Sequence, residues 1–411
     1  MHKGFKRIAA AACAVMMAAS VMTGCSGGAK SDGGSAAPAA SEAKTDKAEQ
    51  GGGADKSVIK LGGLAPLTGN YAEYGKGFQI GFQMAIDEIN ANGGANGHPL
   101  EIDVKDTQGD AVVSSNMATN FAEDDSILAI LGDFTSGACK ANAEIVERYG
   151  IVQLSPTASA PDYANMSKYC FSIMGRQDAE APYLAKYILK KYLDAKKIAV
   201  IRVDSDWGLS CYDNFIKQAE KEGLDVTVEK YASGEKDFSS LITKMRSIDP
   251  DCLVVMDQGD SVAAIFNQAD AAGWDIQHVA LGPGTSEQLV NQLTTPDNLI
   301  VTSPFFFDEN NETLNKWAAT FEEKAGFKPT IHPACAYDCV YLINNAIERI
   351  GDGEITREAI QEALANSENE GVTGALNFTD DGDIQRQYMI CGVKDGKWIV
   401  LEGFDYGAEG L

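Results

Sequence analysis

The sequence predicts an α/β protein in which mainly parallel sheets are covered by helices. Two observations lead to this fold class. Short apolar segments alternate with longer segments of helical periodicity along residues 57–411, and such alternation is typical of parallel sheets with helices on both faces. These residues are also too many for one ordinary hydrophobic core. We therefore expect two lobes of similar α/β architecture.

The first half of this region begins with its clearest predicted helix. Phe78, Phe82, Ile86 and Ile89 recur at spacings of 4, 4 and 3 residues, which places them on one helical face. An Asn-Gly-Gly sequence then ends the helix. The predicted strands around it are 59–65, 102–105, 127–131 and 151–154, and the further helices are about 112–123 and 138–149.

The second half repeats the same alternation. The predicted strands are 198–203, 226–231 and 253–256, and the predicted helices are about 212–222, 239–247 and 262–272. In parallel sheets, ligands bind beyond the carboxyl ends of the strands. The loops that follow strands are therefore where a binding site is expected.

Two strand-to-helix loops carry the residues expected of such a site. Residues 132–137 read Gly-Asp-Phe-Thr-Ser-Gly, and residues 155–161 read Ser-Pro-Thr-Ala-Ser-Ala-Pro. Both offer hydroxyls and backbone N–H groups near helix starts, where the helix dipole favours an anion. The structural alternative is simple N-capping by Ser136 and a turn at 155–161. Because the loops follow neighbouring predicted strands, we expect them to grip a small carboxylate together.

The N-terminus predicts export. Three cations precede an uncharged stretch at 8–22, which is shorter than the roughly 20 apolar residues that a bilayer crossing needs. It fits the apolar part of a signal peptide at 1–24. Met22-Thr23-Gly24-Cys25 resembles a lipobox, which implies diacylation of Cys25 and cleavage just before it. An ordinary secretory leader with an incidental cysteine is the alternative. The expected location is extracytoplasmic, lipid-anchored to the cell membrane.

Residues 25–56 are predicted to be a flexible linker behind the lipidated cysteine. Of the 30 residues at 26–55, 19 are Gly, Ala or Ser, and none is aromatic or a branched aliphatic residue. Such a segment buries too little apolar surface to offset the entropy of ordering.

The formal net charge of −25 argues against a nucleic-acid partner, because nucleic acids select basic surfaces.

The cysteines and histidines do not indicate a metal site. Seven cysteines follow Cys25, and an odd number at irregular spacing is not a disulfide framework. Cys335 and Cys339 stand four residues apart on a predicted helix, but the four histidines are scattered. Buried apolar side chains explain these cysteines better than zinc ligands do. We expect no metal and no cofactor.

Several motifs together resemble a known family. Residues 69–75 and 92–94, the two loops above, the run Gly-Glu-Lys-Asp-Phe-Ser at 234–239 and the run Gln-Ala-Asp-Ala-Ala-Gly at 268–273 are similar to branched-chain amino acid binding proteins. These are the leucine/isoleucine/valine-type substrate-binding proteins of ABC transporters, with the periplasmic binding protein type I fold. The resemblance covers essentially all of residues 57–411.

The resemblance implies two lobes, joined by three hinge strands, that close on ligand. With crossovers near Gly175, Pro304 and Gly382, lobe one is expected at 57–175 with 305–382, and lobe two at 176–304 with 383–411. Contacts in both lobes would favour the closed form, so closure is a population shift. The implied partners are ABC permease membrane subunits and the lipid bilayer, for a monomeric protein.

The resemblance also implies the ligand contacts. Ser136 would hold a ligand carboxylate through its hydroxyl and backbone N–H, within the loop that includes Phe134 and Thr135. The run Thr157, Ala158 and Ser159 would add backbone donors, a carbonyl toward the ammonium and a hydroxyl. The side chains expected around the ligand are Tyr74 near the mouth of the pocket, and Trp207 and Gln258 where the family presents tyrosines.

One departure from the family concerns the ammonium group of the ligand. Leucine-binding members have an acidic residue where this sequence has Gly284, and a buried ammonium without a carboxylate carries a large desolvation cost. Asp204 and Asp257 are the candidates to replace that acid; as alternatives, either is a solvated loop charge. Otherwise the ligand is a carboxylate or amide that is not an amino acid.

Catalysis is not expected. The sequence contains no P-loop and no nucleophile elbow. A sensory ligand-binding protein remains the functional alternative to a transport protein, because the same fold serves both roles.

Overall fold

The computed structural model describes residues 56–282, 284–307, 311–366 and 368–402. The predicted signal peptide at 1–24, Cys25 and the predicted linker up to residue 55 lie outside these residues. Among the described residues, no helix combines the length and the apolar character that crossing a membrane requires.

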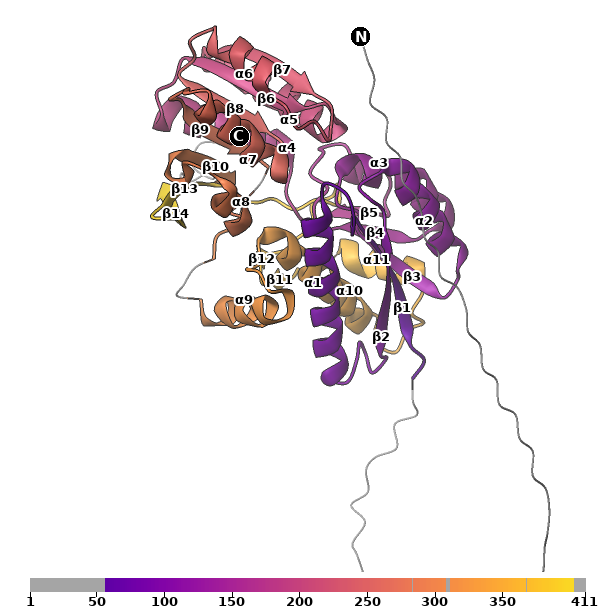
Figure 1. Ribbon diagram of the computed structural model, residues 1–411. Helices are drawn as coiled ribbons and strands as arrows, with labels where there is room; N and C mark the ends of the chain where they lie inside the picture. The colour runs from indigo at the N-terminus through magenta and orange to yellow at the C-terminus, as the bar shows by residue number, and fades with distance from the viewer. Residues whose placement is uncertain (1–55, 283, 308–310, 367, 403–411) are drawn as a thin grey trace, which may run out of the picture. The chain divides into compact units, whose positions relative to one another are not determined.

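The first of two large sheets is entirely parallel (Figure 1). Its strand order is β2-β1-β3-β4-β5. The strands are β1 Ile59–Ala65, β2 Leu100–Asp106, β3 Ile127–Leu131, β4 Val152–Ser155 and β5 Cys170–Ser172.

The second sheet has the order β14-β13-β10-β9-β8-β6-β7. Strands β6 to β10 pair with one another in parallel, whereas β13 pairs antiparallel with both β10 and β14. The strands are β6 Lys197–Val203, β7 Asp225–Tyr231, β8 Cys252–Met256, β9 Gln277–Leu281, β10 Leu299–Ser303, β13 Met389–Lys394 and β14 Lys397–Glu402. A small separate pair is formed by β11 Glu370–Gly371 and β12 Gly374–Ala375.

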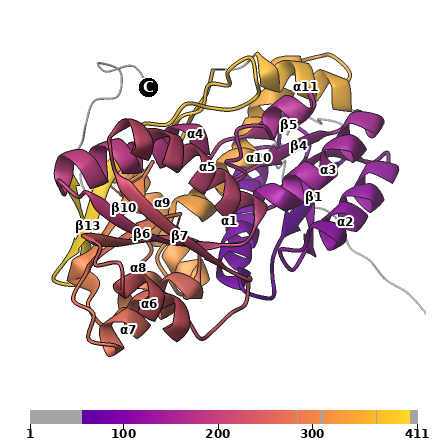
Figure 2. The ribbon, with the colours of Figure 1, turned by 90° about the horizontal axis from the view of Figure 1, so that it is seen from above.

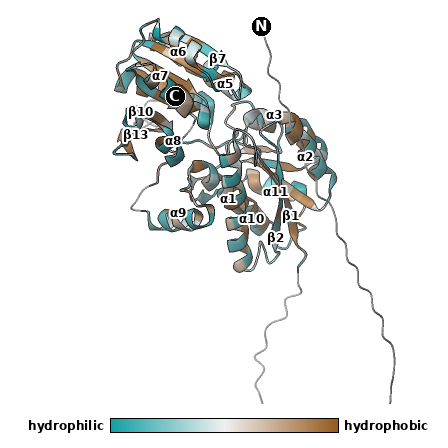
Figure 3. Cartoon of the chain, in the orientation of Figure 1, coloured by the Kyte–Doolittle hydropathy of each residue, from teal (hydrophilic) through white to brown (hydrophobic). Residues whose placement is uncertain are grey.

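Helices fill most of the connections between the strands. They are α1 Ala72–Ala91, α2 Ala111–Glu123, α3 Ser136–Tyr149, α4 Gln177–Tyr183, which continues into the π-helical segment η2 Leu184–Tyr192, α5 Asp206–Lys221, α6 Ser239–Arg246, α7 Asp260–Ala271, α8 Glu287–Gln292, α9 Glu312–Ala325, α10 Ile331–Ile350 and α11 Arg357–Ala365. Two short 3-10 turns are η1 Ala164–Met166 and η3 Pro296–Asn298. Polar residues gather on the outer sides of the helices, and the strands are mainly apolar (Figure 3). The predicted α/β fold class is confirmed.

The predicted elements agree closely with the observed ones, with one marked exception. Helix α5 begins at Asp206, six residues before its predicted start. The reason is local, because the Ser205 hydroxyl accepts a hydrogen bond from the Gly208 N–H at 3.1 Å and caps the helix. The earlier start brings Trp207 into the first turn of the helix.

The buried side chains form two hydrophobic cores. The first core draws on residues 59–173 and 305–384, and the second on residues 181–301 and 388–391. The elements around each are here called the first and second core regions. The chain passes between them after Ile173, after Val301 and after Ile384.

Helices α1 and α10 pack together beside the first sheet (Figures 1 and 2). Their close approach requires a glycine, because a Cβ at Gly81 would lie 2.5 Å from the Pro333 carbonyl oxygen. The predicted apolar stripe of α1 faces inward, and Phe78, Phe82 and Ile86 are all buried. This packing fixes the start of α10, where the next residues of interest lie.

Candidate functional site

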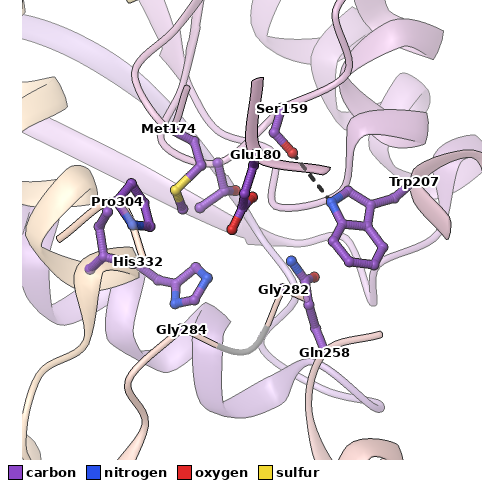
Figure 4. Close-up of a pocket in the computed structure, with 11 residues that line it drawn as sticks. Ser159, Met174, Glu180, Trp207, Gln258, Gly282, Gly284, Pro304 and His332 are labelled. Atoms are coloured by element: carbon purple, nitrogen blue, oxygen red, sulfur yellow. Dashed lines mark hydrogen bonds between the residues drawn. The ribbon is translucent and has the colours of Figure 1, made fainter. Parts of the chain in front are cut away.

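A cavity lies between the two core regions (Figure 4). It contains about 370 Å³ of empty space, part of which is open to solvent. Its lining residues come from loops after strands and from the starts of helices. They are Thr157, Ser159, Met174, Glu180, Trp207, Gln258, Gly282, Gly284, Pro304, Ile331 and His332.

The loop after β4 forms one wall, and serine hydroxyls hold its shape. The Ser155 hydroxyl accepts hydrogen bonds from the Thr157 and Ala158 N–H groups at 3.2 and 2.8 Å. The Ser136 hydroxyl accepts from the Ser159 and Ala160 N–H groups, both at 3.3 Å. The two loops predicted to act together are therefore joined directly.

The residues around Ser136 anchor this wall without lining the cavity. Ser136 is fully buried at the start of α3. The Thr135 hydroxyl caps that helix by accepting from the Ala138 N–H, and the Phe134 carbonyl accepts from the Thr157 hydroxyl at 2.8 Å. The predicted residues Phe134, Thr135, Ser136 and Ala158 thus lie behind the cavity surface that Thr157 and Ser159 form.

Trp207 forms part of the opposite wall. Its indole N–H donates a hydrogen bond to the Ser159 hydroxyl at 3.2 Å, which links the two core regions (Figure 4). Gly282 makes room for the ring, because a Cβ there would lie 2.5 Å from the indole. Gln258, from the loop after β8, also lines the cavity.

Tyr74 lies outside the cavity lining and forms a second link between the core regions. Its hydroxyl accepts a hydrogen bond from the Gly259 N–H at 3.0 Å. Its ring stacks on Phe134 with 4.8 Å between centroids and meets the His332 ring edge-on at 4.7 Å. The aromatic residue predicted near the mouth therefore connects the two sides.

The two aspartates predicted as ammonium partners do not line the cavity. Asp204 is 45% exposed and pairs with Lys230 at 2.8 Å and Arg202 at 3.5 Å. Asp257 is buried, but its carboxylate accepts a hydrogen bond from the Tyr231 hydroxyl and lines an adjacent polar pocket that shares Gln258 with the cavity. Burial raises the pKa of Asp257 to about 6.

Gly284 lines the cavity and presents no acid. It has a positive φ of 60°, and a Cβ there would lie 3.8 Å from both His332 and Ile331. A side chain at this position would therefore point toward the start of α10.

Glu180 lies in the cavity and was missed by sequence reasoning. It comes from α4, and its carboxylate accepts a hydrogen bond from the Thr302 hydroxyl at 2.6 Å. Burial raises its pKa to about 7. It does not belong to a loop that follows one of the predicted strands, because α4 follows a passage between the two cores.

His332 was also missed. It is buried at the start of α10, where its Nδ1 lies 3.0 Å from the Thr330 hydroxyl. Burial lowers its pKa to about 3, so the imidazole is neutral at physiological pH. A Thr-Ile-His-Pro sequence at a helix start is the available signal, because Thr330 caps the helix.

The cysteines contribute nothing to this cavity. All seven in the described residues are buried and free of disulfides. In the same part of the chain, no group of three His, Cys, Asp or Glu side chains is placed to hold a metal ion. Cys335 and Cys339 do share helix α10, where both are fully buried.

Comparison with known proteins shows the family to which this chain belongs. The sequence profile described as "Periplasmic binding protein" matches residues 58–397. The chain belongs to the periplasmic binding protein family. The predicted resemblance to leucine/isoleucine/valine-type proteins of ABC transporters is confirmed, and with it the extracytoplasmic placement that this family implies.

A curated relative from Pseudomonas aeruginosa is the leucine-, isoleucine-, valine-, threonine- and alanine-binding protein. It is 29% identical over 337 residues, covering 80% of this chain and 87% of the relative. The "Leu/Ile/Val-binding protein homolog 1" of Brucella suis is 27% identical over 334 residues, covering 81% and 89%. Members of this family are substrate-binding proteins rather than enzymes.

Solved structures share the fold. The branched-chain amino acid transporter substrate binding protein LivJ from Streptococcus pneumoniae, in complex with isoleucine, is 27% identical with a TM-score of 0.78, covering 84% of this chain and 99% of that one. A solute binding protein from Rhodopseudomonas palustris, in complex with 3,4-dihydroxy benzoic acid, is 19% identical with a TM-score of 0.77, covering 85% and 97%. At that identity the second structure speaks for the fold alone.

Proposed function

We propose that this protein binds a neutral α-amino acid in the cavity between its core regions and delivers it to an ABC permease. The observation that carries the proposal is the cavity itself, since hydroxyl-bearing residues of one core region and Trp207 of the other line it together and are linked by a hydrogen bond. The relatives that bind branched-chain amino acids support the ligand class.

The carboxylate end of the ligand is assigned to the wall formed by Thr157 and Ser159. The Ser159 hydroxyl accepts from Trp207, which leaves its own proton to donate to a ligand oxygen. The nearby start of α3 adds the positive end of a helix dipole. Met174, Ile331 and Pro304 supply apolar surface for the side chain of the ligand.

Ligand binding is coupled to closure of two lobes in this proposal. The three passages between the cores, after Ile173, Val301 and Ile384, support hinges near the predicted positions Gly175, Pro304 and Gly382. A ligand that contacts both lobes stabilises the closed arrangement by its differential affinity. The lobes proposed are 57–175 with 305–382, and 176–304 with 383–411.

The decisive experiment is a thermal-shift and calorimetric screen of the purified protein. The panel contains the common α-amino acids, simple aliphatic carboxylates and benzoates. A bound ligand at 100 times its Kd stabilises the protein by about 2.7 kcal/mol, which raises the melting temperature. The proposal fails if only carboxylates without an amino group produce the shift.

Lipid anchoring through Cys25 is proposed as the means of keeping the protein near its permease. Cys25 and the linker behind it lie outside the described residues, so their sequence supports this step. Several acyl chains on one cysteine hold a protein on a membrane far more firmly than one chain does. We expect Cys25→Ser to move the protein from the membrane to the soluble fraction while its ligand affinity stays unchanged. Continued sedimentation of this variant with membranes would refute the anchor.

A further inference from the structure

We infer that Glu180 is the charge partner of the ligand's ammonium group, in place of the acid that is missing at Gly284. This inference rests on the proposed binding of an α-amino acid and names the residue that selects for it. The acid thus reaches the ligand from α4 rather than from the loop after β9.

The position of Glu180 is the first support. Its carboxylate points into the cavity, between Met174 and Trp207 (Figure 4). One carboxylate oxygen accepts from the Thr302 hydroxyl, a residue of β10 in the second sheet. This hydrogen bond holds the carboxylate in one orientation.

The charges around the cavity are the second support. Of the eleven described residues that line it, Glu180 is the one acid, and none is Lys or Arg. His332, the other titratable residue of the lining, is neutral because burial holds its pKa low. The described lining therefore has one acid and no cation, and an ammonium group of the ligand would supply one.

Because Glu180 is buried, its ionised carboxylate is costly in free energy when no cation pairs with it. Desolvation raises its pKa to about 7, although the hydrogen bond from Thr302 opposes the rise. Attraction between charges is much stronger in a dry site than in water. A ligand ammonium would therefore interact strongly with this group, whereas a second carboxylate beside it would be repelled.

The alternative acids support the same assignment. Asp204 is exposed and already paired with two cations. Asp257 is engaged by Tyr231 in the adjacent pocket. Glu180 is the acid of the described lining whose carboxylate opens into the cavity, where the Ser159 hydroxyl is an uncharged donor.

This arrangement sets a selectivity rule. To bind in this cavity, a ligand needs an ammonium group that pairs with Glu180. It also needs a carboxylate that meets the uncharged wall of Thr157 and Ser159, here called the neutral wall. Monocarboxylates without an amino group, including benzoates, place two like charges in one small cavity. Acidic amino acids are disfavoured for the same reason, since the lining described here offers no cation for a second carboxylate.

The test compares two ligands with one carbon skeleton, leucine and 4-methylpentanoate, which lacks only the amino group. Calorimetry on the full chain, purified in detergent, measures both affinities for the wild type, for Glu180→Gln and for Asp204→Asn. Glutamine keeps the shape and the hydrogen bond from Thr302 but removes the charge. If the ligand screen identifies an amino acid other than leucine, that amino acid and its deaminated analogue are used in place of leucine and 4-methylpentanoate.

We expect the wild type and Asp204→Asn to bind the amino acid and to discriminate against the analogue. Glu180→Gln is expected to lose about 30-fold or more in amino-acid affinity, since breaking a buried charge pair costs about 2 kcal/mol or more. Its affinity for the analogue should rise or stay the same. A melting temperature at or above that of the wild type will show that this variant is folded.

The outcomes separate this inference from the proposed function. If no α-amino acid binds the wild type, the proposed function fails. If an amino acid binds and Glu180→Gln keeps its affinity within about threefold, the function stands and Glu180 is not the partner. Should Glu180→Gln fail to fold, the wild type still decides, because equal affinity for the amino acid and its deaminated analogue overturns the inference.

Discussion

The two walls of the cavity are built in different ways. The wall from the first core region consists of a loop whose backbone is held by the hydroxyls of Ser136 and Ser155. The wall from the second core region consists of the large side chains Glu180, Trp207 and Gln258. One wall depends on where the backbone runs, and the other depends on which side chains are present.

The two walls therefore suit different parts of the ligand. The backbone wall suits a group that every α-amino acid has, whereas the residues of the side-chain wall can vary. Any α-amino acid has a carboxylate, and neutral donors on a loop between two strands suit that group regardless of the rest of the ligand. The ammonium and the side chain of the ligand meet residues that can be exchanged without altering the sheet. Gly284 and Glu180 show such an exchange, since the acid stands in another segment.

Replacing Trp207 tests the side-chain wall and has the largest expected effect. Trp207→Ala removes the ring and the hydrogen bond to Ser159, so ligand affinity should fall by about 2 kcal/mol or more. Trp207→Phe keeps a ring and loses only the N–H group, so it should cost about 0.5–1.5 kcal/mol. Calorimetry measures both affinities, and thermal melting verifies that each variant is folded. Equal losses in the two variants would show that the hydrogen bond, and not the ring, makes this wall.

Replacing Ser136 tests the backbone wall. Ser136→Ala leaves the Ser159 and Ala160 N–H groups without their buried acceptor, and the expected loss of ligand affinity is about 1–3 kcal/mol. Ser167 is a matched control, because its hydroxyl also accepts a backbone N–H, from Tyr169 at 3.1 Å, and it does not line the cavity. Ser167→Ala should lower the melting temperature and leave affinity unchanged. Unchanged affinity in Ser136→Ala would remove this serine from the site.

The sequence predicted the backbone wall from local pattern, and it predicted Trp207 and Gln258 of the side-chain wall but not Glu180. Strands β3 and β4 are short apolar runs followed by Gly, Ser and Thr, so both their existence and the loops after them are evident from local pattern. The register of a parallel sheet then places those loops together. The fold and the pairing of the two loops follow from the same local signals.

Glu180 could not be found in this way. It stands in a helix of seven residues that contains Pro182 and follows a passage between the cores, and nothing in its local sequence separates it from a solvated acid. Asp204 shows the converse case, since it stands directly after β6 but is exposed and does not line the cavity. Its pairing with Lys230 of β7 depends on the register between strands β6 and β7. Both outcomes are set by tertiary contacts rather than by local pattern.

The pH dependence of ligand affinity also distinguishes the two walls, and it is the smallest of the expected effects on affinity. The neutral wall has no group that titrates near pH 7, whereas burial raises the pKa of Glu180 to about 7. Only the ionised carboxylate attracts an ammonium group, so amino-acid affinity should fall about tenfold from pH 8 to pH 6, following one protonation. The groups facing Glu180 do not obscure this change. Burial raises the pKa of Cys211 and of Tyr388 well above their usual values, and His332 remains neutral.

The stability of the unliganded protein should show the opposite trend. Because folding raises the pKa of Glu180 from 4.5 to about 7, the folded protein binds more protons than the unfolded chain between these values. Its contribution to stability is therefore fully present below pH 4.5 and is lost as the pH rises toward 7. Asp257 and Asp383, with pKa values raised by burial to about 6 and about 7, act in the same direction. The difference between wild type and Glu180→Gln, measured by denaturant unfolding and by calorimetry from pH 5 to pH 8, isolates Glu180. If the curves for the wild type and for Glu180→Gln are parallel in both measurements, the titrating group is not Glu180. The side-chain wall then has no charge that attracts the ammonium group.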